Sequence, residues 1–191
     1  MWGENIMNND RIKKFENPER VAELNPKLTL RAAGFERGMT LCDIGAGTGL
    51  FTFAAAEMSA NQIYALEISA PMLDLLKHRI HERKVDNIAV LKSAPAALPI
   101  ADKCCDIALM VTVFHELDNP ALILAECQRI LVSGGKLVII EFHKRTTPMG
   151  PPVVHRIAEE AVENICAGCG FTAASKFTLG DNFYCLIFKI V

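Results

Sequence analysis

The sequence LCDIGAGTGLF, residues 41–51, joins a short apolar run to three glycines at alternate positions, 45, 47 and 49. Glycine permits positive φ angles and lets a ligand approach the main chain without meeting a Cβ atom. The N–H groups that open a helix after the last glycine would point to the same place. The stretch therefore predicts a strand, a bare turn that receives a ligand, and a helix.

The surrounding chain alternates between continuous apolar runs and amphipathic segments. Strands are expected in residues 39–45, 62–68, 87–93, 104–114 and 136–142, and helices in residues 26–33, 50–60, 70–84 and 119–135. Continuous Val, Ile and Leu runs between amphipathic helices are typical of a mostly parallel sheet that is covered on both faces. The pattern predicts a doubly wound, Rossmann-like α/β fold.

The end of the chain departs from this alternation. Residues 153–170 have the pattern of one helix, and two strand-like runs follow, with LGDN at residues 179–182 between them. Gly, Asp and Asn between two apolar runs indicate a β-hairpin. We expect the parallel sheet to close with an antiparallel hairpin.

Composition limits the classes of protein that this sequence fits. The 191 residues are 51% hydrophobic, which predicts a single packed domain over residues 1–191, with residues 1–17 as a flexible lead. A net charge of −2 argues against a nucleic-acid partner. The polar N-terminus and the absence of a long apolar run predict no membrane partner. Seven cysteines, an odd number, favour reduced thiols in the cytoplasm. The oligomeric state stays open.

An acidic residue is placed to act with the glycine turn. Glu67 lies 18 residues beyond Gly49, at the end of the next expected strand. A carboxylate at this point can accept hydrogen bonds from both hydroxyls of a ribose. Leu50 replaces the third glycine of the dinucleotide fingerprint, and no GK[ST] sequence follows the glycines. Asp43 would repel a pyrophosphate and suits a ligand with an amino end.

Four segments carry a family resemblance. LCDIGAGTGLF, ALEIS, LPIADKCCDIALM and ILVSGGKLVIIEF occur in the order found in class I S-adenosylmethionine-dependent methyltransferases. The chain resembles most the small-molecule branch that includes ubiquinone/menaquinone-type enzymes, over residues 18–145, which would form the cofactor-binding core, with residues 146–191 as a terminal helix and hairpin. The resemblance implies a seven-stranded sheet whose last strand is antiparallel. It also implies methyl transfer from S-adenosyl-L-methionine to a small-molecule acceptor.

The resemblance assigns roles to residues around the turn. Glu67 would bind the ribose and Ile68 would pack on the adenine, while the methionine end would be held by Asp43, Gly45, Ala46, Gly47, Thr48 and Gly49. In the family an acidic residue contacts the adenine after the third strand, but here that position is Ala94, followed by Pro95. Either Ser93 or the backbone of Ala94 or Ala96 substitutes, or recognition of the base is weak.

A simpler interpretation of the turn is also open. The glycines would then only allow close packing between strand and helix. This explanation suits Gly49, but it accounts for neither Asp43 nor Glu67.

The acceptor is expected beside the ends of the fourth and fifth strands, since ligands of doubly wound sheets lie outside the carboxyl ends of the strands. Phe114, His115 and Glu116 follow the fourth strand, while Glu141 and a proline-rich loop that would act as a lid end the fifth. His115 is the best candidate for a general base, because an imidazole pKa near 6.5 suits that work. A loop-ordering histidine is the alternative. Glu141 is either a substrate-binding group or a paired structural carboxylate.

The cysteines do not predict a metal site. Cys166 and Cys169 share one helical face, and we expect them to pack against the sheet, with metal or redox chemistry as a lesser alternative. Cys42 and Cys127 have the pattern of core residues. Three other functions stay open: a non-catalytic protein that binds S-adenosylmethionine or a nucleoside, a metalloid methyltransferase that uses cysteines, and a nicotinamide oxidoreductase.

Overall fold

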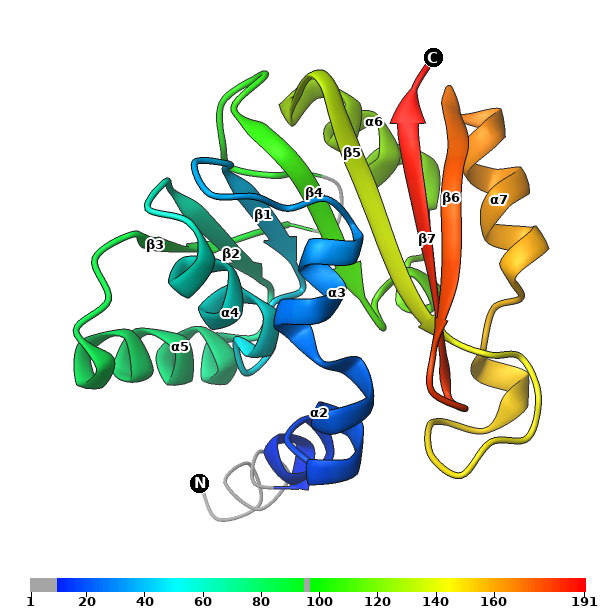
Figure 1. The fold of residues 1–191 in the computed structure, drawn as a ribbon, viewed down its shortest axis with the longest axis horizontal. Helices are drawn as coiled ribbons and strands as arrows, with labels where there is room; N and C mark the ends of the chain where they lie inside the picture. Colours follow the sequence, from blue (N-terminus) through cyan, green and yellow to red (C-terminus); the bar gives the residue numbers. More distant parts are fainter. Residues whose placement is uncertain (1–9, 95–96) are drawn as a thin grey trace.

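The computed structural model describes residues 10–94 and 97–191. Within them, one seven-stranded sheet has the order β3-β2-β1-β4-β5-β7-β6 (Figure 1). Neighbours among β1 to β5 pair in parallel, and β7 pairs antiparallel with both β5 and β6. The predicted fold, with its terminal hairpin, is confirmed. The strands are β1 (Leu41–Ile44), β2 (Ile63–Glu67), β3 (Ile88–Lys92), β4 (Cys105–Val111), β5 (Leu131–Phe142), β6 (Phe171–Leu179) and β7 (Phe183–Ile190).

Helices cover both faces of the sheet (Figure 1). One face packs against α2 (Pro18–Leu24), α3 (Pro26–Ala32), α4 (Leu50–Met58) and α5 (Ala70–Arg83), and the other against α6 (Pro120–Ile130) and α7 (Glu159–Gly168). Successive strand residues point to opposite faces. In β1, Leu41 therefore packs among residues of α3 and α4, while Cys42 and Ile44 pack among residues of α6 and α7. Burial on both faces explains the continuous apolar runs.

The segment 153–170 is not one helix, as its pattern predicted. It contains a short 3₁₀ turn, η2 (Val153–His155), then extended residues, and α7 from Glu159. The extended part is held by tertiary contacts: the Arg156 side chain is buried, and the Ile157 carbonyl accepts a hydrogen bond from the Tyr184 hydroxyl at 3.0 Å. These contacts fix a conformation that local helix propensity does not favour.

The segment 119–135 also ends its helix earlier than expected. Helix α6 stops at Ile130, and Gly134 and Gly135 lie within β5. The register between β4 and β5 shifts at this place, because Cys105 pairs with Leu131 while Ile107 pairs with Lys136. The glycine pair therefore belongs to an irregular start of the strand and does not terminate the helix.

Part of the expected flexible lead is ordered. Residues 10–15 are helical and pack against the glycine turn, whereas residues 1–9 lie outside the described part of the chain. The single-domain organisation stays a prediction. Among the described helices, none has both the length and the apolar character needed to cross a membrane.

Candidate active site

The turn after β1 is fastened to β2 by its own main chain. The N–H groups of Gly45 and Ala46 both donate to the Leu66 carbonyl, at 2.8 and 3.0 Å, and the N–H of Gly49 donates to the Ala46 carbonyl at 2.9 Å. The N–H groups expected to face a ligand are those that open α4 after Gly49, so these three bonds do not test that expectation. These three main-chain bonds fix the conformation of the turn against β2.

The three glycines serve different purposes. A Cβ atom at Gly45 would lie 2.6 Å from the Val113 side chain, and one at Gly49 would lie 2.7 Å from Phe53. Both positions need glycine for close packing, which agrees with the simpler interpretation of Gly49. Gly47 has φ 54°, and a Cβ atom there would meet only ordinary contacts of 3.6 Å or more, the nearest with Phe15. Gly47 is the glycine at which the core leaves the main chain approachable.

Glu67 is fixed directly beside Gly47. Its Oε2 accepts from the Gly47 N–H at 2.9 Å, and its Oε1 accepts from the N–H groups of Ile68 and Ser69 at 2.8 and 2.9 Å. An ionised carboxylate has about four acceptor positions, so these bonds leave room for a further donor. The side chain thus stands at the carboxyl end of β2 as a rigid acceptor next to the turn.

Asp43 lies deeper, between β1 and α4. Its side chain is buried, and its Oδ2 accepts from the Thr52 hydroxyl at 2.6 Å. Burial raises the pKa of Asp43 to about 6, and the neighbouring charge of Glu67 acts in the same direction. Thr52 was missed by the sequence analysis, although a threonine at the third position of an apolar helix, nine residues after Asp43, was a usable signal.

The expected adenine side has one exposed apolar residue. Ile68 is 62% exposed beside Glu67. The N–H of Ser93 donates to the Glu67 carbonyl at 3.1 Å, so Ser93 adjoins the end of β2. Ala94 forms a bridge with Ala97, in which the N–H of each donates to the carbonyl of the other at 3.3 Å. The Ala94 N–H is thereby engaged, and the predictions on Pro95 and Ala96 lie outside the described residues.

The N-terminal segment covers the turn. The Phe15 ring lies against Gly47, Glu16 forms an ion pair with Arg79, and Arg79 Nη1 donates to the Thr48 carbonyl at 2.9 Å. The sequence analysis missed these residues, because no local pattern connects positions 15–16 with position 79. Figure 1 shows this segment beyond the carboxyl ends of β1 and β4.

His115 and Glu141 form a buried pair at the ends of β4 and β5. His115 lies in the 3₁₀ turn η1 (Phe114–Glu116), and its Nδ1 is 2.9 Å from both carboxylate oxygens of Glu141. The His115 main-chain N–H also donates to Glu141 Oε1 at 3.2 Å. The hydrogen bond with Glu141 raises the pKa of His115, and burial opposes this effect. Of the two alternatives for Glu141, the structure shows the paired carboxylate.

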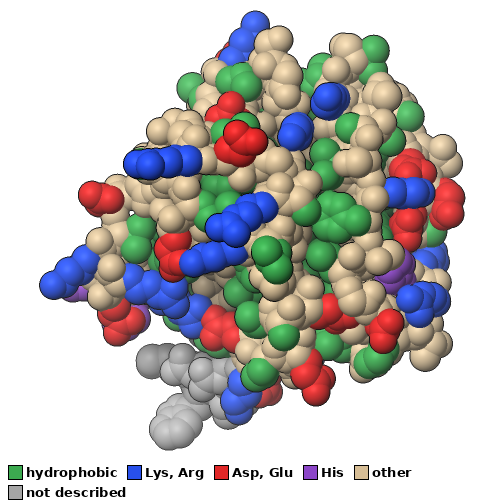
Figure 2. All heavy atoms as spheres, viewed as in Figure 1, with side chains coloured by type: hydrophobic (Ala, Val, Ile, Leu, Met, Phe, Trp, Pro, Cys, Tyr) green, Lys and Arg blue, Asp and Glu red, His purple; other side chains and the backbone are tan. Residues whose placement is uncertain are grey.

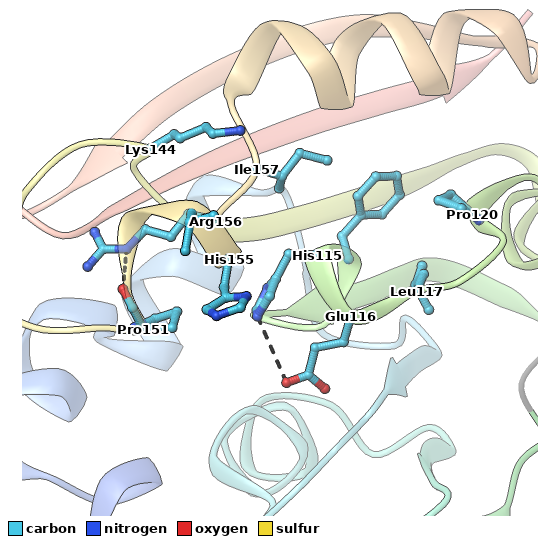
Figure 3. A pocket seen from close by; sticks show the side chains of 11 residues that line it. His115, Glu116, Leu117, Pro120, Lys144, Pro151, His155, Arg156 and Ile157 are labelled. Atoms are coloured by element: carbon cyan, nitrogen blue, oxygen red, sulfur yellow. Dashed lines mark hydrogen bonds and ion pairs between the residues drawn. The ribbon is translucent and has the colours of Figure 1, made fainter.

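A cavity of about 640 Å³ opens beside His115 (Figure 3). Its walls come from η1 and from the segment around η2, and most of the lining side chains are apolar or aromatic. The lining residues are Phe114, His115, Glu116, Leu117, Pro120, Lys144, Pro151, Val154, His155, Arg156 and Ile157. Volumes of roughly 300–1,000 Å³ are typical of small-molecule sites.

The loop after β5 is anchored and forms one wall of this cavity. Arg156 Nε donates to the Pro151 carbonyl at 2.7 Å, and Nη1 donates to the carbonyls of His143 and Arg145 at 3.0 and 2.9 Å. The Arg156–Pro151 contact is drawn in Figure 3. The loop is therefore tied to the segment that follows it, and its expected role as a lid stays a prediction.

The cysteines pack as expected. Cys42, Cys127 and Cys166 are buried in the core on the α6 side, and Cys169 packs against them half-buried. In the described part of the chain, no three side chains of His, Cys, Asp or Glu come together in a manner that would hold a metal ion.

Comparisons with known proteins agree with this architecture. A family model described as "Methyltransferase domain" matches residues 42–139, about half of the chain. The chain is 30% identical over 127 residues to the ubiquinone/menaquinone biosynthesis C-methyltransferase UbiE of Cellvibrio japonicus, covering 65% of this chain and 51% of that protein. It is also 30% identical over 126 residues to the demethylmenaquinone methyltransferase of Lactococcus lactis, covering 63% of this chain and 49% of that protein.

A solved structure matches over nearly its whole length. The crystal structure of a SAM-dependent methyltransferase from Aquifex aeolicus superposes with a TM-score of 0.90 at 27% identity, covering 95% of this chain and 98% of that one. In contrast, the chain spans about half the length of the two curated relatives. The likeness to those relatives therefore concerns only part of each of them.

Proposed function

This chain belongs to the methyltransferase domain family, and from that premise we propose that it transfers a methyl group from S-adenosylmethionine to a small-molecule acceptor. One observation carries the proposal: the turn and Glu67 lie on the same edge of the sheet as the cavity with the His115–Glu141 pair. A donor site and an acceptor site thus adjoin at the carboxyl ends of neighbouring strands, where ligands of such sheets bind.

The residues around the turn fit S-adenosylmethionine. Glu67 is a rigid acceptor suited to the ribose hydroxyls, and the exposed Ile68 offers an apolar surface to the adenine. Asp43 is suited to the amino end, because a nearby ammonium would favour its ionised form over the protonated form that burial favours. Gly47, where a Cβ atom would meet only ordinary contacts, is the glycine of the turn that packing does not require. We assign the donor to these residues, together with Gly45, Ala46, Thr48, Gly49 and Ser93.

When bound, S-adenosylmethionine supplies an electrophilic methyl group on a sulfonium. The protein aligns the acceptor and excludes water, and these two effects can account for much of the acceleration. Glu141 accepts the Nδ1–H of a neutral His115, which leaves the Nε2 lone pair free. His115 is then able to take a proton from an acceptor that arrives protonated, while Glu141 fixes the tautomer and orientation of the ring.

The cavity supports an apolar or aromatic acceptor. Phe114, Leu117 and Ile157 supply apolar walls, and Lys144 adds a positive charge at the lining. The relatives are named for ubiquinone, menaquinone and demethylmenaquinone, and we extend a quinone-type acceptor to this chain. All seven cysteines are free thiols, which supports action in the reducing cytoplasm.

Two measurements test the function. Calorimetry with S-adenosylmethionine and, separately, with NAD⁺ is expected to show binding of the first alone. Labelled methyl groups are then expected to appear on an acceptor when the protein is given a demethylated quinol or a metabolite extract. Binding of the donor without transfer to any acceptor would support the non-catalytic alternative, and binding of NAD⁺ alone would overturn the donor assignment.

A further inference from the structure

The N-terminal segment, residues 10–20, touches both halves of the site. Phe15 lies on Gly47 at the turn, five residues before Arg20 in α2. Arg20 is 9% exposed, and its Nη1 donates to the Phe15 carbonyl at 3.0 Å. Its Nη2 donates to the Thr112 hydroxyl at 3.2 Å, across 92 residues of sequence. One arginine therefore joins the segment over the turn to the end of β4.

The position that Arg20 reaches is conformationally strained. Thr112 has φ 54°, a region that residues other than glycine rarely adopt. Its N–H donates to the Ile140 carbonyl at 2.7 Å, so the end of β4 is bonded to the residue that precedes Glu141. His115 follows three residues later. Thr112 is thus the point from which the chain turns to place His115 on Glu141.

Arg20 also brings a buried positive charge to this region. Burial lowers the pKa of Arg20 to about 10, and the negative charge of Glu141 opposes that effect. The guanidinium is therefore charged at neutral pH. It is held between two rings, with its central carbon 5.8 Å from the ring centroids of Phe15 and of Phe183. Its location is fixed by packing as well as by hydrogen bonds.

We propose that Arg20 is a positioning residue for methyl transfer, which anchors Thr112 and sets the charge balance of the His115–Glu141 pair from the segment that covers the glycine turn. The proposal rests on the proposed function only in treating that pair as the base. Protonation of the His115–Glu141 pair then depends on whether residues 10–20 lie against the glycine turn, because Phe15 and Arg20 belong to one hydrogen-bonded unit.

Several charged or titratable side chains besides Arg20 lie near His115 and influence its pKa. Glu141 contacts Nδ1, Glu116 lies 3.9 Å from Nε2, and Lys144, His155 and Arg156 line the same cavity. Replacing Arg20 by glutamine leaves all of these in place and removes one positive charge beside Glu141. A lost cation favours protonation of a nearby imidazole, so the pKa of His115 is expected to rise further, by about one pH unit.

Histidine ring titration by NMR tests the proposal without an acceptor. The His115 signals are assigned with His115→Gln, and the titration is repeated in Arg20→Gln, Arg20→Lys and Arg37→Gln. Arg37 is exposed before β1, at the opposite edge of the sheet, and its substitution removes the same charge. We expect the midpoint to rise in Arg20→Gln, to stay near the parent value in Arg20→Lys, and to be unchanged in Arg37→Gln. An unchanged midpoint in Arg20→Gln, or an equal rise in Arg37→Gln, would overturn the proposal.

A second variant tests the proposal if Arg20→Gln does not fold. Thr112→Val removes the hydroxyl that Arg20 contacts and keeps every charge. Its His115 midpoint is expected to move upward by a smaller amount, and parent-like titration in a folded Thr112→Val protein would contradict the anchoring. Calorimetry with S-adenosylmethionine distinguishes failure of the proposed function from failure of the proposal on Arg20. Absence of donor binding in the parent protein refutes the proposed function, whereas the histidine titration alone decides the role of Arg20.

Discussion

At the level of single residues, the two carboxylates beside the turn are held in different ways. Glu67 receives three main-chain N–H bonds, whereas Asp43 is buried with one hydroxyl bond from Thr52. A buried carboxylate with few donors favours its protonated form. Glu67 is thus a preformed acceptor, while Asp43 is a group whose ionisation costs stability until a cation arrives.

The pH dependence of stability tests this view of Asp43. Its pKa is about 6 in the folded protein, above the value of roughly 3.9 in an unfolded chain, so the folded state binds the proton more tightly. The ligand-free protein therefore loses stability as pH rises from about 4 through 6. Asp43→Asn, which does not titrate, is expected to be more stable than the parent at pH 8 by about 1–3 kcal/mol, and to bind the donor more weakly.

Urea unfolding at pH 4.5 and pH 8 measures how Asp43→Asn changes the free energy of unfolding. Asp74→Asn, an exposed substitution on α5, is the matched control and is expected to change stability little at either pH. A variant Asp43→Asn that is less stable than the parent by the same amount at both values would show that the hydrogen bond with Thr52 outweighs burial.

Glu67 has a separate prediction. Glu67→Ala removes the acceptor for the N–H groups of Gly47, Ile68 and Ser69, together with the proposed ribose ligand. Donor affinity is expected to fall by about 10- to 150-fold, the effect of losing a charged hydrogen-bonding partner worth about 1.5–3 kcal/mol. Calorimetry with S-adenosylmethionine measures it, with Asp74→Ala as the control. Parent-like affinity in Glu67→Ala would remove Glu67 from the donor site.

At the level of elements, the segment from β5 to α7 depends on one side chain. Arg156 is buried and donates to several loop carbonyls, to the Thr147 hydroxyl at 2.6 Å, and lies 5.4 Å from the centre of the Phe142 ring. A guanidinium has five N–H donors in a fixed plane, so it can satisfy several carbonyls that would otherwise lack partners. The loop is ordered by its bonds to this arginine and not by regular secondary structure.

Arg156→Lys is therefore expected to loosen the loop without changing the sheet. Lysine keeps the charge but cannot bridge the same set of carbonyls, and the loss is expected to exceed about 2 kcal/mol for local opening. Amide hydrogen exchange of residues 143–152 is the measurement, with the strand β7 as an internal reference. Exchange in this loop that matches the parent protein would show that other contacts, such as that between the Met149 N–H and Asn182, suffice.

At the level of the whole molecule, the strand order brings distant residues to one edge. The neighbouring strands β2, β1, β4 and β5 all run in parallel, so their carboxyl ends meet there. Figure 2 shows hydrophobic and charged side chains interspersed over the face in view, without a field of one sign.

The division into donor and acceptor sites predicts a separable effect. Val154 lines the cavity and is 78% exposed, so Val154→Trp narrows the cavity without disturbing the core. We expect KM for the acceptor to rise by about tenfold or more, the effect of at least about 1.4 kcal/mol, while the donor Kd stays unchanged. Leu122→Trp, on α6 outside the cavity lining, is the control. Equal effects of both substitutions on KM would place the acceptor elsewhere.

The sequence by itself determined the fold class and the location of the glycine turn between β1 and α4. Alternating apolar and amphipathic runs reflect burial on both faces of a parallel sheet, and this pattern is local. The same holds for Asp43, Gly47 and Glu67, because each lies within, follows or ends a strand that the pattern predicts. His115 was found from its place after a strand, whereas the role of Glu141 was left open between a substrate-binding group and a paired structural carboxylate.

Only the tertiary structure decided which distant groups act together. Glu141 pairs with His115, Thr52 with Asp43, and Arg20 with Thr112, and no periodicity connects these positions. It also showed that the N–H groups of Gly45, Ala46 and Gly49 are bonded within the fold, and that residues 153–170 are divided by the buried Arg156. The physical reason is common to these cases. A buried charge or carbonyl without a partner is costly, so each one is paired with a group that the fold brings near it, however distant that group is in the sequence.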